Sequence, residues 1–270
     1  MCRSVRAVGA AGSYSVMAND DASSRDFPKE WYDVASEDHF WMEWRVKVLS
    51  EHLRRLGFDP KAALSAFDIG CGHGVVQRQL SRSTAWVVDG CDLNDEAIAR
   101  NTGHRGCTLS YNIFDKSPEM RARYDIIFLL DVIEHVEDPV AFLRAAAYYS
   151  KPKGVVVINV PSMPRLASAY DEALGHLRRY SKASLRQDMS DAGLETVSIA
   201  YWGMSLLPLL VLRKLLMPFT RPENLIERGF NPPGRFADKI FRMAMTAELA
   251  VTNDPPWGTS LLAVARTSGQ

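Results

Sequence analysis

Short apolar runs alternate with amphipathic stretches over most of the chain. Several of these runs are apolar at consecutive positions, which is typical of parallel strands that are buried on both faces. Where strands alternate with helices in this way, a doubly wound α/β sheet is the expected fold. The pattern predicts strands over 66–69, 85–91, 108–111, 124–130, 154–160, 194–202 and 259–266, and helices over 74–81, 94–101, 138–149 and 182–192.

An aromatic stripe precedes this pattern, and a long insertion separates its last two strands. Phe40, Trp41 and Trp44 begin a stripe at helical spacing over 37–56, which predicts an amphipathic helix ended by Gly57. We therefore expect five parts. They are a disordered leader (1–27), a cap helix (28–58), an α/β core (59–203), a helical lid insertion (204–258), and a stretch with the last strand and tail (259–270).

The charge balance and the cysteines exclude several classes of protein. Lys plus Arg and Asp plus Glu number 32 each, so the formal net charge is zero, which argues against nucleic acid as a partner. Four scattered cysteines without a CxxC pair argue against a disulfide framework and against a structural zinc site. No apolar segment follows Arg3 and Arg6, as a secretory signal would require, so we expect a cytoplasmic protein.

The lid insertion begins within an apolar stretch that is too short to span a membrane. Residues 196–212 are uncharged over 17 positions, whereas a spanning helix needs roughly 20, and Gly203 and Pro208 interrupt them. We therefore expect no transmembrane span. A lid over an apolar acceptor, a dimer surface and peripheral membrane contact through 204–219 remain three alternatives for this segment.

A glycine-rich turn stands where the first buried strand meets a helix. The run Asp68-Ile69-Gly70-Cys71-Gly72-His73-Gly74 lets the backbone approach a ligand closely. A P-loop would need a Lys after the glycines, and a dinucleotide fingerprint would need glycine at Val75. Asp68 would repel a pyrophosphate and favour a ligand that carries an ammonium group.

A second acidic residue follows the second predicted strand. Asp92 ends the apolar run that begins at residue 85, which is where a carboxylate usually binds the two hydroxyls of a ribose. Asp89 and Asp95 are competitors for this role. Asp92 fits best because Asn94 is then placed to cap the next helix.

With these two elements the sequence resembles the class I S-adenosylmethionine-dependent methyltransferases. It is most similar to the small-molecule enzymes of the ubiquinone-biosynthesis O-methyltransferase type. The resemblance covers 66–160 closely, and 176–202 and the last strand more loosely. The motifs that carry it are the glycine turn, Asp92, Asp131-Val132-Ile133-Glu134-His135-Val136 with Asp138-Pro139, Lys151-Pro152-Lys153-Gly154, and His176-Leu177-Arg178-Arg179-Tyr180-Ser181.

The resemblance implies a Rossmann-like seven-stranded sheet, with the last strand antiparallel between the fifth and sixth, and a helical cap. It implies S-adenosyl-L-methionine as the cofactor and S-adenosyl-L-homocysteine as its product. Where this family often has an acid near the adenine, the present chain has Asn112. The expected cofactor-binding residues are Asp68, Gly70, Cys71, Gly72, Gly74, Asp92, Leu93, Asn112, Ile113 and Asp131.

Two histidines are candidates for the acceptor chemistry. His135 follows the fourth strand and is the favoured base for a hydroxyl acceptor, whereas His176 is expected to orient the acceptor from a loop. A structural pairing of His135 with Glu134 is the alternative. We expect no metal, although Asp131, Glu134 and His135 form a weak candidate set. The expected substrate-binding residues are Trp41, Arg178, Arg179 and Tyr180.

The favoured function is therefore O-methylation of a small-molecule acceptor, with an apolar acceptor among the options and a histidine as base. A binding protein for the same cofactor is one alternative, and N- or C-methylation is another. An NAD-type oxidoreductase is disfavoured by Val75. We expect the chain to act as a monomer or a homodimer.

Overall fold

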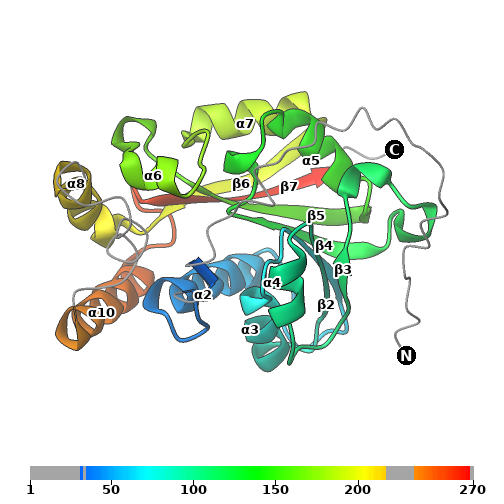
Figure 1. The fold of residues 1–270 in the computed structure, drawn as a ribbon, viewed down its shortest axis with the longest axis horizontal. Helices are drawn as coiled ribbons and strands as arrows, with labels where there is room; N and C mark the ends of the chain where they lie inside the picture. Colours follow the sequence, from blue (N-terminus) through cyan, green and yellow to red (C-terminus); the bar gives the residue numbers. More distant parts are fainter. Residues whose placement is uncertain (1–30, 33–34, 217–233, 268–270) are drawn as a thin grey trace.

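Seven strands form one sheet in the order β3-β2-β1-β4-β5-β7-β6 (Figure 1). The coordinates are a computed structural model, and the structure describes residues 31–32, 35–216 and 234–267. The strands are β1 (Ser65–Ile69), β2 (Val87–Asp92), β3 (Thr108–Ser110), β4 (Tyr124–Leu130), β5 (Ser150–Pro161), β6 (Leu194–Trp202) and β7 (Ser260–Thr267).

The last strand lies where the sequence predicts it. β7 pairs antiparallel with β5 on one side and with β6 on the other, whereas β1, β2, β3, β4 and β5 pair in parallel. Val157 on β5 lies opposite Val264 on β7, and both side chains are fully buried. The predicted doubly wound α/β sheet with an antiparallel last strand is confirmed.

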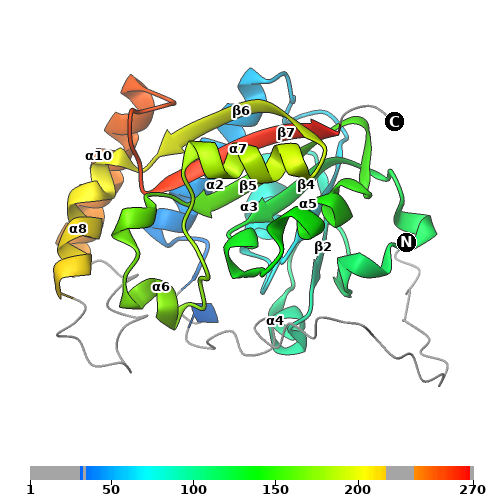
Figure 2. The same cartoon turned by 90° about the horizontal axis from the view of Figure 1, so that it is seen from above.

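Helices cover both faces of the sheet, so its central strands are buried on both sides. α5 (Pro139–Ala147) and α7 (Lys182–Asp191) pack on one face, and α7 lies over β6 and β7 in Figure 2. The other face carries α2 (Phe40–Arg55), α3 (Val75–Ser83) and α10 (Arg235–Val251). This arrangement explains why the strand sequences are apolar at consecutive positions.

Side-chain caps set the starts of several helices. The Asn94 side chain accepts hydrogen bonds from the amides of Glu96 and Ala97, both at 3.1 Å, and α4 (Asp95–Arg100) follows it as predicted. α6 (Ala169–Ala173) was not expected in the polar connector after β5. It is one short turn, held by a capping box between Ser168 and Asp171.

The lid insertion is helical where the structure describes it. The turn η6 (Met204–Leu206) leads into α8 (Leu207–Leu216), and α10 returns the chain to β7. Residues 217–219 of the predicted membrane-contact stretch, and the leader over 1–27, lie outside the described residues. The proposed division into five parts stays a prediction. Among the helices of the described ranges, none is both long enough and apolar enough to cross a bilayer.

One buried carboxylate joins the two halves of the lid. Glu248 on α10 accepts hydrogen bonds from the backbone amides of Gly203 at 2.8 Å, Met204 at 3.1 Å and Ser205 at 2.8 Å. These amides precede α8 and have no intrahelical acceptor, so the carboxylate acts as their cap. Glu248 therefore fixes the point at which α8 leaves β6.

We predict that Glu248→Ala lowers the free energy of unfolding by about 3 kcal/mol, because three buried amides lose a charged acceptor. Glu248→Gln is the matched control. Its amide oxygen can still accept the bonds from Gly203 and Met204, so it should keep most of the stability. Urea denaturation of both variants measures the difference, and equal loss in the two variants would show that the negative charge, which both variants lack, is responsible rather than the hydrogen bonds that Gln keeps.

Candidate active site

A cavity of about 1040 Å³ lies at the carboxyl ends of the parallel strands. This is the edge of an open α/β sheet at which ligands bind. Its volume is at the upper end of the usual range for small-molecule sites, roughly 300–1000 Å³. The walls come from the glycine turn after β1, the ends of β2 and β4, the loop after β3, α2, the connector around α6, and the start of the lid.

The glycine turn forms one wall of the cavity. Its start is fixed because the amides of Gly70 and Cys71 both donate to the carbonyl of Cys91, at 2.8 and 3.0 Å. Gly72 has a φ of +51°, a conformation that side chains disfavour, and a Cβ there would meet the Tyr32 ring at 3.5 Å, an ordinary van der Waals contact. At Gly72 the turn thus presents its backbone, rather than a side chain, to the cavity.

Asp68 lies at the base of this turn and is almost fully buried. The pKa of its carboxyl group is raised to about 7, because burial and the Asp92 carboxylate together outweigh the opposing effect of the Arg45 guanidinium. A buried carboxylate is costly unless a cation compensates it. The predicted partner, an ammonium group on a ligand, would supply that compensation.

Asp92 ends β2 and faces the same cavity. One of its oxygens accepts from the amide of Gly72 at 2.8 Å, and the other accepts from the amide of Asn94 at 2.9 Å. These bonds hold the carboxylate against the glycine turn. Leu93, Asn112 and Ile113 also line the cavity, and the Asn112 side chain accepts from the amide of Phe114 at 3.0 Å.

A buried polar chain links four elements behind the cavity. The guanidinium of Arg45, on α2, donates to the Asp131 carboxylate at the end of β4. The Asn159 side chain donates to the other oxygen of Asp131 at 2.7 Å, and the Trp202 indole donates to Asn159 at 2.9 Å. Asp131 has a φ of +60°, so its backbone turns sharply at the cavity wall.

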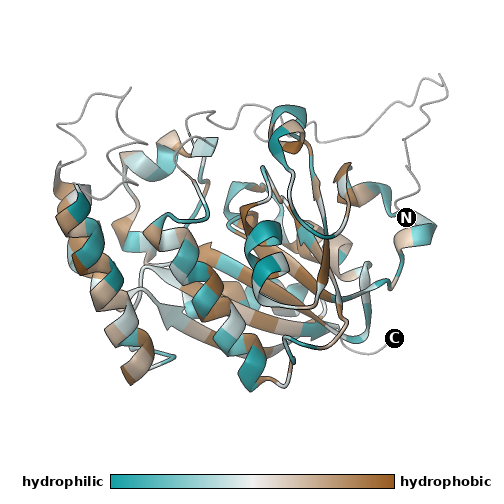
Figure 3. Cartoon of the chain, turned by 90° about the horizontal axis from the view of Figure 1, so that it is seen from below, coloured by the Kyte–Doolittle hydropathy of each residue, from teal (hydrophilic) through white to brown (hydrophobic). Residues whose placement is uncertain are grey.

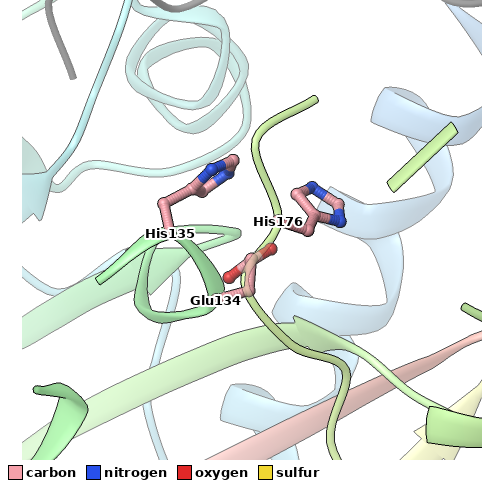
Figure 4. A group of neighbouring side chains, drawn as sticks. All are labelled: Glu134, His135 and His176. Carbon is pink, nitrogen blue, oxygen red and sulfur yellow. The ribbon is translucent and has the colours of Figure 1, made fainter. Parts of the chain in front are cut away.

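Three titratable side chains converge on the acceptor side of the cavity (Figure 4). One ligand-capable atom from each of Glu134, His135 and His176 lies within 4.8 Å of the others. Glu134 is fully buried, and neither of its oxygens has a hydrogen-bond partner among the described residues. Burial and the nearby Asp131 carboxylate raise the pKa of Glu134 well above its ordinary value. This carboxylate is the least compensated group of the site.

The two histidines have different surroundings. The rings of His135 and His176 meet edge to face, with centroids 4.8 Å apart. Burial lowers the pKa of His135 to about 3, with a further contribution from His176, and its Nδ1 lies 3.2 Å from the Gly175 carbonyl oxygen. The Nδ1 of His176 instead lies 3.2 Å from the Asp171 carboxylate, which also pairs with Arg179 at 3.0 Å. His176 therefore has a carboxylate, that of Asp171, in position to orient its ring.

Most of the predicted site residues line the cavity, but three do not. Trp41 and Arg179 are on its wall, as are all predicted cofactor residues except Gly74. Tyr180 is buried in the core beneath α7. Arg178 is not on the lining itself, and it donates at 3.1 Å to the carbonyl of Glu137, which is on the lining. The motif around His176 is therefore split between the cavity, the core and a loop contact.

Several cavity residues were not predicted. Arg45 and Asp171 carry charge into the site, and Leu206, Leu209 and Leu210 form the lid wall. Arg45 falls within the apolar stripe of α2, and a charge at a stripe position is the sequence feature that identifies it. The pairing of Asp171 with His176 depends on the fold of α6, which has no periodic pattern to reveal it.

Comparison with known proteins gives a consistent assignment. A family model described as a methyltransferase domain matches residues 40–199. A ubiquinone biosynthesis O-methyltransferase of Caulobacter vibrioides is 28% identical over 167 residues, which cover 57% of this chain and 66% of that protein. The match thus spans less than two thirds of the length of that relative.

Solved structures share the fold at low identity. A methyltransferase in complex with the Haloferax volcanii activator Trm112 superposes with a TM-score of 0.61 at 19% identity, covering 92% of this chain and 98% of that one. The phosphoethanolamine N-methyltransferase 2 of Haemonchus contortus, solved in complex with S-adenosyl-L-methionine, has a TM-score of 0.51 at 16% identity. It covers 82% of this chain and 52% of that one. The domain match, the sheet order and the glycine turn with Asp92 together show that the chain belongs to the class I S-adenosylmethionine-dependent methyltransferases.

Proposed function

We propose that the protein transfers a methyl group from S-adenosylmethionine to a hydroxyl of a small, partly apolar acceptor. The observation that carries this proposal is the cavity. It joins the glycine turn and Asp92 at one side to a histidine–carboxylate pair and an apolar lid at the other. A single site with these two halves suits two reactants held next to each other. The cytoplasm remains the proposed location, with the chain acting as a monomer or a homodimer.

The cofactor half is built to hold both ends of a charged ligand. Asp68 would bind the ammonium group of the methionine part. Arg45, whose charge acts on Asp68, could bind the carboxylate group of the methionine part. Asp92 would accept hydrogen bonds from the ribose hydroxyls, and Asn112 with Ile113 would border the adenine. S-adenosylmethionine supplies an electrophilic methyl group on a sulfonium. The methionine part would lie along the glycine turn, where Gly72 brings no side chain of its own into the cavity.

The acceptor half combines apolar walls with a polar end. Trp41 from α2 and Leu206, Leu209 and Leu210 from the lid provide the apolar surface. His135 and His176, with Glu134 behind them, provide the polar end. An acceptor with an apolar body and a hydroxyl at one end matches this distribution.

We assign the base to His176 rather than to His135. A general base must be neutral and still basic enough to take the hydroxyl proton, and the low pKa of His135 makes it a weak one. With Nδ1 of His176 held by Asp171, its Nε2 is the nitrogen that takes the proton while the acceptor oxygen takes the methyl group. The products are the methylated acceptor, S-adenosylhomocysteine and a protonated His176. His135 then positions the acceptor.

A divalent cation is a second use of the same cluster. Glu134, His135 and His176 offer one carboxylate and two imidazoles, and a cation would compensate the buried Glu134. Both imidazoles have Nδ1 next to an oxygen, as histidines that bind metal commonly do. The set predicted from the sequence contained Asp131 in place of His176. In the structure the Asp131 carboxylate is engaged by Arg45 and Asn159, and His176 is the third member of the cluster.

The direct test is turnover. Calorimetric titration with S-adenosylmethionine and with NAD separates a methyltransferase from an oxidoreductase. Release of S-adenosylhomocysteine in the presence of phenols and catechols with alkyl chains separates an enzyme from a binding protein. Amine and carbanion acceptors in the same assay distinguish N- and C-methylation from O-methylation.

We predict that Asp92→Ala weakens S-adenosylmethionine binding by about 10- to 100-fold, because charge-assisted bonds to the ribose are lost. Asp95→Ala is the matched control. Asp95 is exposed three residues further on, and its carboxylate is engaged by Ser110. Calorimetry measures both dissociation constants. Equal binding by the Asp92 variant and the unmodified chain would exclude Asp92 as the ribose ligand.

We predict that S-adenosylmethionine binding weakens as the pH falls below about 7. The Asp68 carboxyl has a pKa raised to about 7, so below that value a proton must leave before the ammonium binds. The dissociation constant should rise by up to about tenfold per pH unit below this point and level off above it. Asp68→Asn should bind weakly at all pH values and lose this dependence. A flat profile for the unmodified chain would contradict the role of Asp68.

We predict that His176→Ala lowers kcat by about 100- to 10,000-fold while the dissociation constant of S-adenosylmethionine stays nearly unchanged. His135→Ala should act mainly on the KM of the acceptor. Asp171→Asn should lower kcat less than His176→Ala, because it removes only the group that orients the base. Steady-state kinetics of the three variants measure these effects.

The metal alternative gives a different pattern. Chelation would then abolish turnover, added Mg²⁺ or Zn²⁺ would restore it, and Glu134→Gln would lower metal affinity in direct titration. Full turnover after chelation would exclude it. A large fall in kcat for His135→Ala, with His176→Ala unaffected, would overturn the assignment of the base.

A further inference from the structure

Exposed apolar side chains concentrate on the lid helices. Large apolar residues that face solvent in the described chain include Val211, Leu212 and Leu215 on α8 and Phe236, Ile240 and Met243 on α10. Phe236 is 79% exposed and Met243 is 63% exposed, which is unusual for side chains of this size. In Figures 1 and 2, α8 and α10 lie at the same end of the molecule. A concentration of this kind marks an interaction surface.

α10 is apolar on two opposite sides. Phe241, Met245 and Leu249 recur at intervals of four and pack into the core beneath the sheet. Phe236, Ile240 and Met243 recur at intervals of four and three, so they form a second stripe that faces outward. Figure 3 shows hydrophobic and hydrophilic segments alternating along this helix. A helix of a globular domain needs only its core stripe, so the outer stripe is not explained by folding.

The charges beside the outer stripe are positive. Arg235 and Lys239 are exposed and lie next to Phe236 and Ile240 in the sequence. The acid of this part of the helix, Asp238, pairs with Arg242 at 2.8 Å. Arg242 also contacts Glu43 on α2 and thereby fixes that side of α10 to the body of the protein. The outer surface thus combines bulky apolar groups with two cations.

We propose that the outer stripe of α10, formed by Phe236, Ile240 and Met243 with Arg235 and Lys239, docks the protein on an anionic lipid bilayer. Interfacial helices combine these groups in the same way, with apolar side chains entering the headgroup region and cations meeting anionic lipids. The stripe is far too short to span the membrane and is held by its inner face, so the helix lies on the surface. Docking does not depend on methyl transfer.

A lipid surface fits this stripe better than a second copy of the chain. In a twofold dimer the same patch meets itself, so one interface would contain Arg235 and Lys239 from both copies, and the stripe as defined here contributes no acid to compensate them. An anionic bilayer attracts the same two cations.

The stripe is also close to the cavity, because Phe241 on the inner side of α10 packs against Phe40 of the cavity wall with ring centroids 5.5 Å apart. A docked molecule would hold its cavity near the bilayer.

Vesicle sedimentation of the full chain tests the proposal. We expect binding to vesicles of phosphatidylcholine with phosphatidylglycerol, weaker binding to phosphatidylcholine alone, and a decrease with added salt. Phe236→Ser combined with Ile240→Ser should lower the partition constant at least tenfold (an order-of-magnitude estimate). Lys239→Gln should lower it roughly fivefold and reduce the effect of salt.

Two variants on other elements are matched controls. Trp257 is 60% exposed beyond the helix, and Val87 is 47% exposed at the start of β2. Trp257→Ser and Val87→Ser should bind vesicles as the unmodified chain does. Far-UV circular dichroism and urea denaturation confirm that the stripe variants are folded.

Three outcomes would overturn the proposal. The first is no preference for anionic vesicles, and the second is unchanged binding by the folded Phe236→Ser and Ile240→Ser variant. The third is a dimer in solution that this double substitution converts to monomer, which would assign the stripe to a second copy. None of these outcomes bears on cofactor binding, so failure here is distinguishable from failure of the proposed methyl transfer.

Discussion

The buried pairing of Arg45 with Asp131 is the constraint on which the site depends. The Arg45 side chain is buried and the Asp131 side chain is largely buried. Removing one partner of a buried pair typically lowers the free energy of unfolding by about 3–5 kcal/mol, because the other charge then lacks its partner. The pair also sets geometry. Through Asn159 and Trp202 it connects α2, β4, β5 and β6, elements that are distant in sequence. The ends of the strands that form the cavity are therefore held in register by polar contacts as well as by the sheet.

Around this pair, the site contains carboxylates whose charge is not fully compensated. The raised pKa values of Asp68 and Glu134 have the same cause, burial near another acid, which is Asp92 for Asp68 and Asp131 for Glu134. Each therefore favours a cationic neighbour, which folding alone does not supply. An ammonium on the cofactor side and a proton or metal ion on the acceptor side would each lower the cost of burial. Binding of such a cation would therefore be favoured, because it relieves the unfavourable burial of these carboxylates.

The sequence predicts the parts of this protein that depend on local pattern. Consecutive apolar residues located the strands, and the Asp92 position was identified because it ends the second of them. The placement of β7 between β5 and β6 came from the family resemblance, and the sheet order confirms it. Arg45, the α6 turn and the pairing of Asp171 with His176 escape prediction, because each depends on contacts between distant segments. Our proposal assigns the base to His176 for a similar reason. Position along the chain favoured His135, but burial, which position does not reveal, lowers the pKa of His135.

The two halves of the cavity differ in how they are fixed. The cofactor half is formed by turns that leave the sheet directly, so the strand register determines its shape. The acceptor half is formed partly by the lid, whose start is held by the Glu248 carboxylate from α10. α10 therefore has two roles in the architecture: its Glu248 caps the start of the lid, and its opposite face bears the outward stripe. The shape of the lid wall thus depends on a contact between two helices, whereas the shape of the glycine turn depends on the pairing of adjacent strands.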